Sequence, residues 1–426
     1  MNKKLNTLII TLLSVTYTAI AQQTTESPYS FYGVGERNFG GLTEESAMGG
    51  VGVFADSTRV NIQNPAALAS LKYTSFSAGL TMQSKKIVTS TQKLNVGASA
   101  FDYVVLGFPI TKNLGIGVGL LPYSSVGYKI KSTVGSNNYQ YEGRGNVNQF
   151  FGSVAYKVYD GLQVGVSMKY HFGNIAMKDV MQQHNVEFYT QEESKSVLSG
   201  AVFNLGLYYQ HTLQQRLRLY SSLVYTPESK LSSENERTIS LLSYINNGKQ
   251  GTQLAVRNGS TVDLAAKGLK NTKLTLPAQT EIGLGIGAHQ QWFAGVAYTF
   301  TANSKFANPF LSTTNVGYEN SYKLSVGGFW IPNYNSFSSY WHKVTYRVGF
   351  RYDSMGIVLN GERLNDFGTS FGLTLPVKGF SNLTGMIELG RKGTLSAGGT
   401  KEHHRQYGNG NSGRGNRKEK RTKEHY

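Results

Sequence analysis

The feature that most limits how this chain can fold is a repeated alternation of apolar with small or polar side chains. The clearest example is residues 162–172, where Leu162, Val164, Val166, Met168, Tyr170 and Phe172 alternate with Gln163, Gly165, Ser167, Lys169 and His171. Successive side chains of a β-strand point to opposite faces, whereas a helix would spread the same residues around its surface. The segment is therefore predicted to be a strand with one apolar face.

The same alternation recurs at 76–82, 201–209 and 280–286, and roughly thirteen segments of the length of a membrane strand lie between residues 73 and 391. The segments are joined alternately by short and by longer connections, as in barrels with short periplasmic turns and long outer loops. If the chain starts in the periplasm, this alternation makes both the first and the thirteenth strand run toward the outside of the cell. Because an open edge in lipid leaves backbone groups unpaired, a fourteenth strand must return and close the barrel.

The closing strand has to come from residues 392–426, which carry few apolar side chains. Three interpretations stay open: a degenerate strand around 394–410 with a basic extension, a tail in place of a lost strand, or a reading-frame change near residue 400. We adopt the first. The predicted fold is all-β, a transmembrane antiparallel β-barrel of about 14 strands.

The N-terminus predicts export. Lys3 and Lys4 precede a short apolar stretch at 8–15, and Ala19-Ile20-Ala21 is a small-residue cleavage site. The predicted division is a signal peptide at 1–21, an N-terminal hatch or plug at 22–72, the barrel at 73–410 and a basic tail at 411–426. The expected location is the outer membrane of a Gram-negative cell, reached through the Sec system.

Composition excludes several classes of function. The chain has no cysteine, so disulfides and thiolate chemistry are excluded, and the adjacent His403 and His404 lack the spacing of a metal site. The formal charge of +17 comes with a basic cluster in the last residues, and an exported chain is not expected to bind nucleic acid. No hydrolase or nucleotide motif occurs. We therefore expect no enzyme, no cofactor and no metal.

Residues 22–72 lack the alternation of the barrel and are rich in glycine. They contain Ser27-Pro28-Tyr29, then Ala47-Met48-Gly49-Gly50, then Asn61-Ile62-Gln63-Asn64-Pro65-Ala66. This run resembles the N-terminal hatch of the FadL/TodX family of outer-membrane transporters, and the resemblance continues through Leu276-Pro277 and 346–350 to Gly390-Arg391-Lys392-Gly393. The candidate hatch residues are Gly49, Gly50, Asn61, Asn64, Pro65 and Ala66.

The resemblance implies a lateral exit from the lumen through a kinked third strand. The third segment, 115–127, is interrupted at Leu121-Pro122, where proline removes a hydrogen-bond donor. Gly119, Leu121 and Pro122 are therefore candidate lateral-gate residues. The plain alternative is that Pro122 ends the strand where it leaves the bilayer.

The largest predicted outer loop, 227–273, carries apolar residues at a spacing that suits a short amphipathic helix. Its candidate ligand-capture residues are Ile239, Leu241, Leu242, Tyr244 and Ile245. The alternative is that these side chains pack within the loop.

Two functions follow from these interpretations. The first is passive uptake of hydrophobic small molecules, such as long-chain fatty acids or aromatic hydrocarbons, gated by the hatch, with lipid and the solute as partners. The second is a structural or shuttle subunit of an outer-membrane protein secretion or assembly machine, whose partners are other outer-membrane proteins. An apolar pocket between hatch and wall indicates the first function. A filled polar lumen without such a pocket, together with stable co-purification of partner proteins, indicates the second.

Overall fold

The computed structural model describes residues 25–90, 92–213, 217–246, 252–288, 290–311, 316–377, 381–395 and 399–414. The predicted signal peptide lies outside these residues, as does most of the predicted basic tail. No helix among the described residues is long and apolar enough to cross a membrane.

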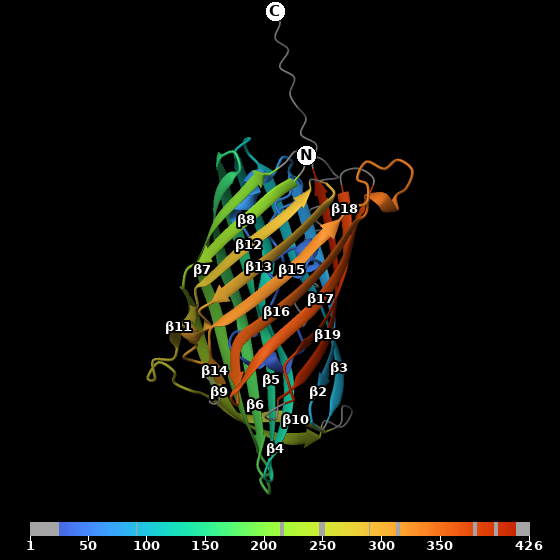
Figure 1. Cartoon of the computed structure of the whole chain (residues 1–426). Coiled ribbons are helices and arrows are strands. Elements are labelled where there is room, and N and C mark those ends of the chain that lie inside the picture. The colour runs from blue at the N-terminus through green and yellow to red at the C-terminus, as the bar shows by residue number, and fades with distance from the viewer. Residues whose placement is uncertain are drawn as a thin grey trace, which may run out of the picture.

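Fourteen antiparallel strands form a closed barrel (Figure 1). In chain order they are β2 (Ser75–Val88), β3 (Lys93–Pro109), β4 (Leu114–Val134), β5 (Asn137–Tyr159), β6 (Leu162–Gln182), β7 (Tyr189–Thr212), β8 (Leu217–Thr226), β12 (Gln279–Ala288), β13 (Trp292–Thr301), β15 (Ser321–Trp330), β16 (Thr345–Leu359), β17 (Glu362–Pro376), β18 (Ser381–Lys392) and β19 (Lys401–Arg414). The predicted alternation holds: on β6, Val166, Met168 and Tyr170 are exposed on the outside, and Gln163, Ser167 and His171 are buried inside. The fold class predicted from the sequence is confirmed.

The fourteenth strand is β19, which pairs with β18 on one side and with β2 on the other, from Lys401↔Val88 to Arg414↔Ser75. It lies a few residues later than the predicted 394–410. Its outward face is mostly polar, with Arg405, Asn409 and Asn411 exposed, so apolar alternation could not reveal it. Backbone pairing and inward contacts hold the strand instead.

The two ends of the barrel differ. At the end drawn at the top of Figure 1, β5 and β6 are joined by Asp160 and Gly161 alone, and β3 and β4 by residues 110–113. We call this the short-turn end. At the opposite, long-loop end, β4 to β7 run on as long hairpins, and β9 (Ser229–Asn246), β10 (Thr252–Thr261) and β11 (Asn271–Leu276) extend the sheet beside β7. The remaining short strand, β14 (Val316–Tyr318), pairs with β16.

The described N-terminal segment, residues 25–72, runs inside the barrel, where the blue chain is visible between the strands of Figure 1. It contains η2 (Pro28–Phe31), β1 (Glu36–Arg37), α2 (Thr43–Ser46) and η3 (Pro65–Ser70). Hydrogen bonds tie it to several parts of the wall: Ser27 N–H donates to the Gly127 carbonyl at 2.8 Å, and Asn64 Nδ2 donates to the Leu207 carbonyl at 2.9 Å. The segment is therefore anchored to the wall at both β4 and β7.

Candidate functional site

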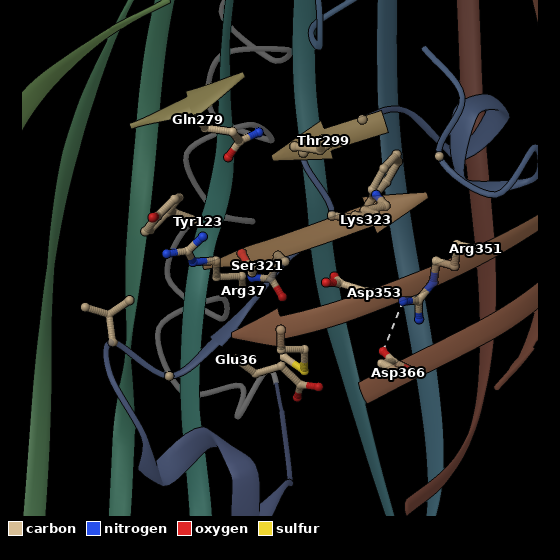
Figure 2. Close-up of a pocket in the computed structure, with 18 of the residues that line it drawn as sticks. Glu36, Arg37, Tyr123, Gln279, Thr299, Ser321, Lys323, Arg351, Asp353 and Asp366 are labelled. Atoms are coloured by element: carbon tan, nitrogen blue, oxygen red, sulfur yellow. Dashed lines mark hydrogen bonds and ion pairs between the residues drawn. The ribbon is translucent and has the colours of Figure 1, made fainter. Parts of the chain in front are cut away.

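A cavity of about 440 Å³ lies at mid-height in the lumen, between the N-terminal segment and the wall. Figure 2 shows its lining, with Lys323, Asp353 and Arg351 on β15 and β16 directed toward the interior near Glu36 and Arg37. The strands place charged side chains there because these residues occupy the inward positions of the alternation. Several charged groups line this cavity and a second one of about 720 Å³, so neither of the two is the apolar pocket expected between the segment and the wall.

Glu36 is the centre of the contacts that hold the N-terminal segment. Its carboxylate accepts hydrogen bonds from Lys85 Nζ on β2 at 2.6 Å, from Lys392 Nζ on β18 and from the Thr25 hydroxyl. Its side chain is only 16% exposed. Burial alone raises the pKa of the Glu36 carboxyl, but the ammonium groups of Lys392 and Lys85 hold that pKa well below its usual range. One carboxylate thus joins the strands on either side of β19.

Other contacts reinforce the same closing seam. The Ser27 hydroxyl donates to the Glu402 carboxylate on β19 at 2.5 Å, and the Tyr29 hydroxyl donates to the Thr400 carbonyl. Because β19 itself offers few apolar side chains, these polar contacts from the N-terminal segment are a substantial part of what holds it inward.

A second ionic cluster lines the wall opposite β4. Arg351 Nη1 lies 3.0 Å from Asp366 on β17, the contact dashed in Figure 2, and its Nη2 lies 2.8 Å from Glu388 on β18. His404 Nε2 on β19 is 3.4 Å from the same Glu388 carboxylate. Buried charges need such partners, since each would otherwise be desolvated without compensation. This part of the lumen is therefore lined by paired charges.

The candidate hatch residues all lie where the segment turns against itself or against the wall. Gly49 and Gly50 adopt positive φ angles of 68° and 93° after α2, and Gly49 N–H donates to Ser370 Oγ at 3.0 Å. Asn61 Oδ1 accepts the Asn64 N–H at 2.9 Å, and Asn64 Oδ1 accepts the Ala66 N–H at 3.0 Å. Pro65 begins η3, where its missing N–H leaves no donor unpaired. A gating role for these residues stays a proposal.

Wall glycines let the segment approach this closely. A side chain at Gly349 would meet the backbone of Met48 and Gly49, and one at Gly165 would meet Pro65 and Ala66. Gly115, Gly206 and Gly327 face the segment in the same way. Glycine on the inward face of these strands is therefore explained by close backbone packing.

The substitution Gly349→Val is expected to displace the N-terminal segment while the barrel stays closed, because the new side chain occupies the space of the Met48 and Gly49 backbone. Limited proteolysis should then cut within residues 25–72, which the wild-type barrel protects. Gly152→Val is the matched control, since nothing lies within 4 Å of a Cβ at Gly152. Equal protection in both variants would contradict the close-packing explanation.

A buried carboxyl in α2 predicts a pH dependence. Burial, together with the nearby Glu44 carboxylate, raises the pKa of Glu45 from 4.5 to about 8. The folded chain then binds more protons than the unfolded chain between these values, so the stability that Glu45 contributes is present below pH 4.5 and falls as the pH rises through about 8. Glu45→Gln keeps an acceptor for the Leu42 N–H and should remove the decline. Urea unfolding midpoints of both proteins at about pH 5 and about pH 9 measure this loss of stability. The same change in midpoint for the wild type and the variant would refute the prediction.

The wall is interrupted between β3 and β4. These strands pair only from Val104↔Leu120 to Pro109↔Gly115, although β3 continues along β2 to Lys93 and β4 continues along β5 to Val134. On the inside, β1 covers the freed edge of β4 at Ser124 and Ser125. The wall thus opens toward the long-loop end, with the N-terminal segment across the opening.

The three candidate lateral-gate residues lie at the start of this interruption. Gly119 is in the last paired stretch, Leu121 follows the last pair, and a register shift lies between Pro122 and Ser124. β4 continues beyond Pro122 to Val134. The alternative that Pro122 ends the strand is therefore wrong.

The candidate capture residues lie on β9 rather than on a helix, so the expected amphipathic helix is wrong. The segment pairs with β7 and β10, and its β-branched residues suit that extended conformation. Ile239, Leu241 and Tyr244 are exposed, Leu242 is buried, and Ile245 lies near the end of the strand.

Sequence reasoning missed Glu36, Lys85, Lys392 and Glu402. The available signal was charge at inward positions: Lys85 and Lys392 fall where a membrane strand points to the lumen. Which carboxylate meets them could not be derived, because Glu36 is separated from Lys392 by most of the chain.

Comparison with known proteins supports the fold. The chain is similar to the CymD monoaromatic hydrocarbon channel, with 15% identity and a TM-score of 0.56 over 89% of this chain and 99% of that one. It is similar to the toluene transporter TbuX of Ralstonia pickettii, with 15% identity and a TM-score of 0.57 over 89% and 100% of the two chains. It is also similar to a FadL homologue of Pseudomonas aeruginosa, with 14% identity and a TM-score of 0.55 over 89% of this chain and 98% of that one. At these identities the likeness concerns the fold.

No curated protein matches the chain in sequence. A family model does: the model described as BamG matches residues 1–407. A match over this much of the chain establishes common descent, and the chain therefore belongs to the BamG family.

Proposed function

We propose that this chain is an outer-membrane barrel that serves as a structural subunit of a protein-assembly machine of that membrane, with its lumen held shut by the N-terminal segment. The observation that carries the proposal is the interior, where Glu36 joins Lys85 and Lys392 and where Arg351 joins Asp366 and Glu388. Membership of the BamG family agrees with a place among outer-membrane assembly proteins.

The polar interior argues against passage of an apolar solute along the barrel axis. Such a solute would have to separate paired charges and leave them without water or a partner, at a cost of several kcal/mol for each ion. The same pairs hold the N-terminal segment against the wall, which suits a barrel that presents surfaces to other proteins. The proposal includes export through residues 1–21, a hatch at 22–72, and a basic tail beyond the barrel.

The deciding experiment is mass spectrometry of the mature protein extracted in mild detergent, with bound proteins and bound lipids scored in one sample. Protein partners in fixed stoichiometry are expected. A stoichiometric fatty acid or hydrocarbon without any protein partner would overturn the proposal.

The second candidate is a channel for hydrophobic small molecules, and the opening between β3 and β4 favours it. A solute received near the exposed side chains of β9 would leave sideways past Gly119, Leu121 and Pro122. The solved structures with this fold include hydrocarbon and toluene channels. In that case the N-terminal segment is the gate.

A disulfide tests this second candidate, because the chain has no cysteine of its own. Asn38 Nδ2 donates to Ser125 Oγ at 3.2 Å, so Asn38→Cys with Ser125→Cys should lock the segment to the free edge of β4. If the barrel takes up labelled toluene into proteoliposomes, oxidation should stop uptake and reduction should restore it. Ser196→Cys with Asn235→Cys, whose side chains meet at 2.9 Å between β7 and β9, is the control. Uptake unchanged by the first lock would exclude this gate.

A further inference from the structure

One connection at the short-turn end departs from the rest. Residues 331–344 join β15 to β16 and form the orange loop that projects beside β18 in Figure 1. The side chain of Phe337 is 100% exposed, Trp341 is 61% exposed, and Tyr334 and Tyr340 are exposed as well. Aromatic side chains are enriched at the centres of protein interfaces and are rarely left free in water without a reason.

One hydrogen bond within the loop and one to β17 order it. Asn333 N–H donates to the His342 carbonyl at 2.8 Å, and the Tyr340 hydroxyl donates to the Pro376 carbonyl at 3.0 Å. Lys343 Nζ lies 5.6 Å from the centroid of the Phe337 ring. The aromatic groups are thus presented on a fixed backbone, which lowers the entropy lost when they bind.

The same loop forms one wall of a basin across the mouth of the barrel. The basin has a volume of about 720 Å³, and Tyr334 and Lys343 line it. Its other cationic residues come from the N-terminal segment, from the turn between β3 and β4, and from the ends of β5 and β8: Arg59, Lys72, Lys112, Lys157 and Arg218. Asp56 is the one acidic residue among its lining, and it is paired with Arg59 at 2.8 Å.

Most of these cations have no carboxylate. Lys157 pairs with Asp160, but Lys72, Lys112, Arg218 and Lys343 form no ion pair within the part of the chain that the structure describes. Apolar side chains, including Phe54, Phe329 and Ile331, line the basin between them. The mouth therefore combines unpaired positive charge with apolar surface.

We infer that this face binds an acidic segment of a partner protein, with carboxylates against Lys72, Lys112, Arg218 and Lys343 and an apolar side chain against Phe337 and Trp341. The short-turn end of a membrane barrel faces the periplasm, so the partner is a periplasmic protein or domain. The inference deepens the proposed function, on which it rests, by giving the chemistry of one partner.

The position of the basin favours a protein segment over lipid. The cations lie inside the ring of turns, whereas lipid headgroups surround the barrel on its outside. A single phosphate would fill little of a cavity of about 720 Å³ and would leave its apolar lining uncovered. An extended peptide with both carboxylates and apolar side chains matches both kinds of surface.

The test uses the full-length protein in nanodiscs of zwitterionic lipid and a fluorescent peptide in which glutamates alternate with leucines. Wild-type protein should bind it saturably, and less tightly as salt rises. The combined variant Lys72→Glu, Lys112→Glu, Arg218→Glu and Lys343→Glu should weaken binding at least about tenfold. Phe337→Ser with Trp341→Ser should weaken it too, and less of that loss should depend on salt.

The control changes the same residue types at the long-loop end: Lys131→Glu, Lys267→Glu and Phe188→Ser, all exposed. It should bind as the wild type does. Equal binding by all variants, full competition by inorganic phosphate, or binding of phosphatidylglycerol vesicles without any peptide binding would each overturn the inference. If the wild type and the basin variants co-extract the same partner proteins, this surface is wrong and the subunit proposal stands. If the wild type co-extracts no partner protein, the proposed function as a subunit is itself wrong.

Discussion

Replacing Glu36 with alanine is expected to destabilise the barrel by about 3–5 kcal/mol, because two largely buried ammonium groups lose their shared carboxylate. Lys85 and Lys392 are only 6% and 5% exposed in their side chains, so each ammonium group would lose its partner in a largely desolvated position. The N-terminal segment should loosen at the same time, since β1 carries the contact. Urea unfolding in detergent measures the free energy, and proteolysis within 25–72 measures the loosening.

The matched control is Glu319→Ala, which removes an ion pair with Arg363 in which the two side chains are 46% and 58% exposed. Surface pairs contribute at most about 1 kcal/mol, so little change is expected. Restoring charge balance with Glu36→Ala in a Lys392→Met background should recover part of the stability. Equal effects for Glu36 and Glu319 would show that the luminal pairs do not hold the seam.

Truncation after residue 400 should abolish the closed barrel. It removes β19, so β18 and β2 both lose a partner along their length, and each backbone group left unpaired in lipid costs several kcal/mol. The shift between heated and unheated migration in gel electrophoresis, which reports a closed barrel, should disappear.

Truncation after Arg414 is the control for that experiment, because all fourteen strands end at or before this residue. It should fold and migrate as the full chain does. A closed barrel after truncation at 400 would mean that β2 and β18 pair directly, and the strand number deduced from parity would then be wrong.

Both effects concern the same seam, and this connects stability to the proposed function. The N-terminal segment contacts β2, β18 and β19 through Lys85, Lys392 and Glu402, and it also covers the opening beside β4. One segment therefore closes the barrel at its last strand and at its interrupted wall. A subunit built in this way keeps its shape without solute or lipid in the lumen.

The sequence by itself determined the alternating strands of the wall, the parity that requires a closing strand, and the fold class, because side-chain alternation and the need to pair backbone groups in lipid are local and general rules. It also identified the N-terminal segment, and it placed Pro122 where the wall is irregular. Sequence reasoning predicted the wrong secondary structure for the segment around Ile239. Its apolar spacing also suits a helix, but pairing with the neighbouring strand β7 makes it a strand.

Only the tertiary structure decided what fills the lumen. Inward lysines and glutamates can be recognised along each strand, but their partners are set by barrel closure, which brings Glu36 beside Lys392. The same holds for the basin at the short-turn end, whose cations come from segments far apart in the chain. Contacts between distant residues depend on the register and closure of the whole barrel, and no local pattern contains that information.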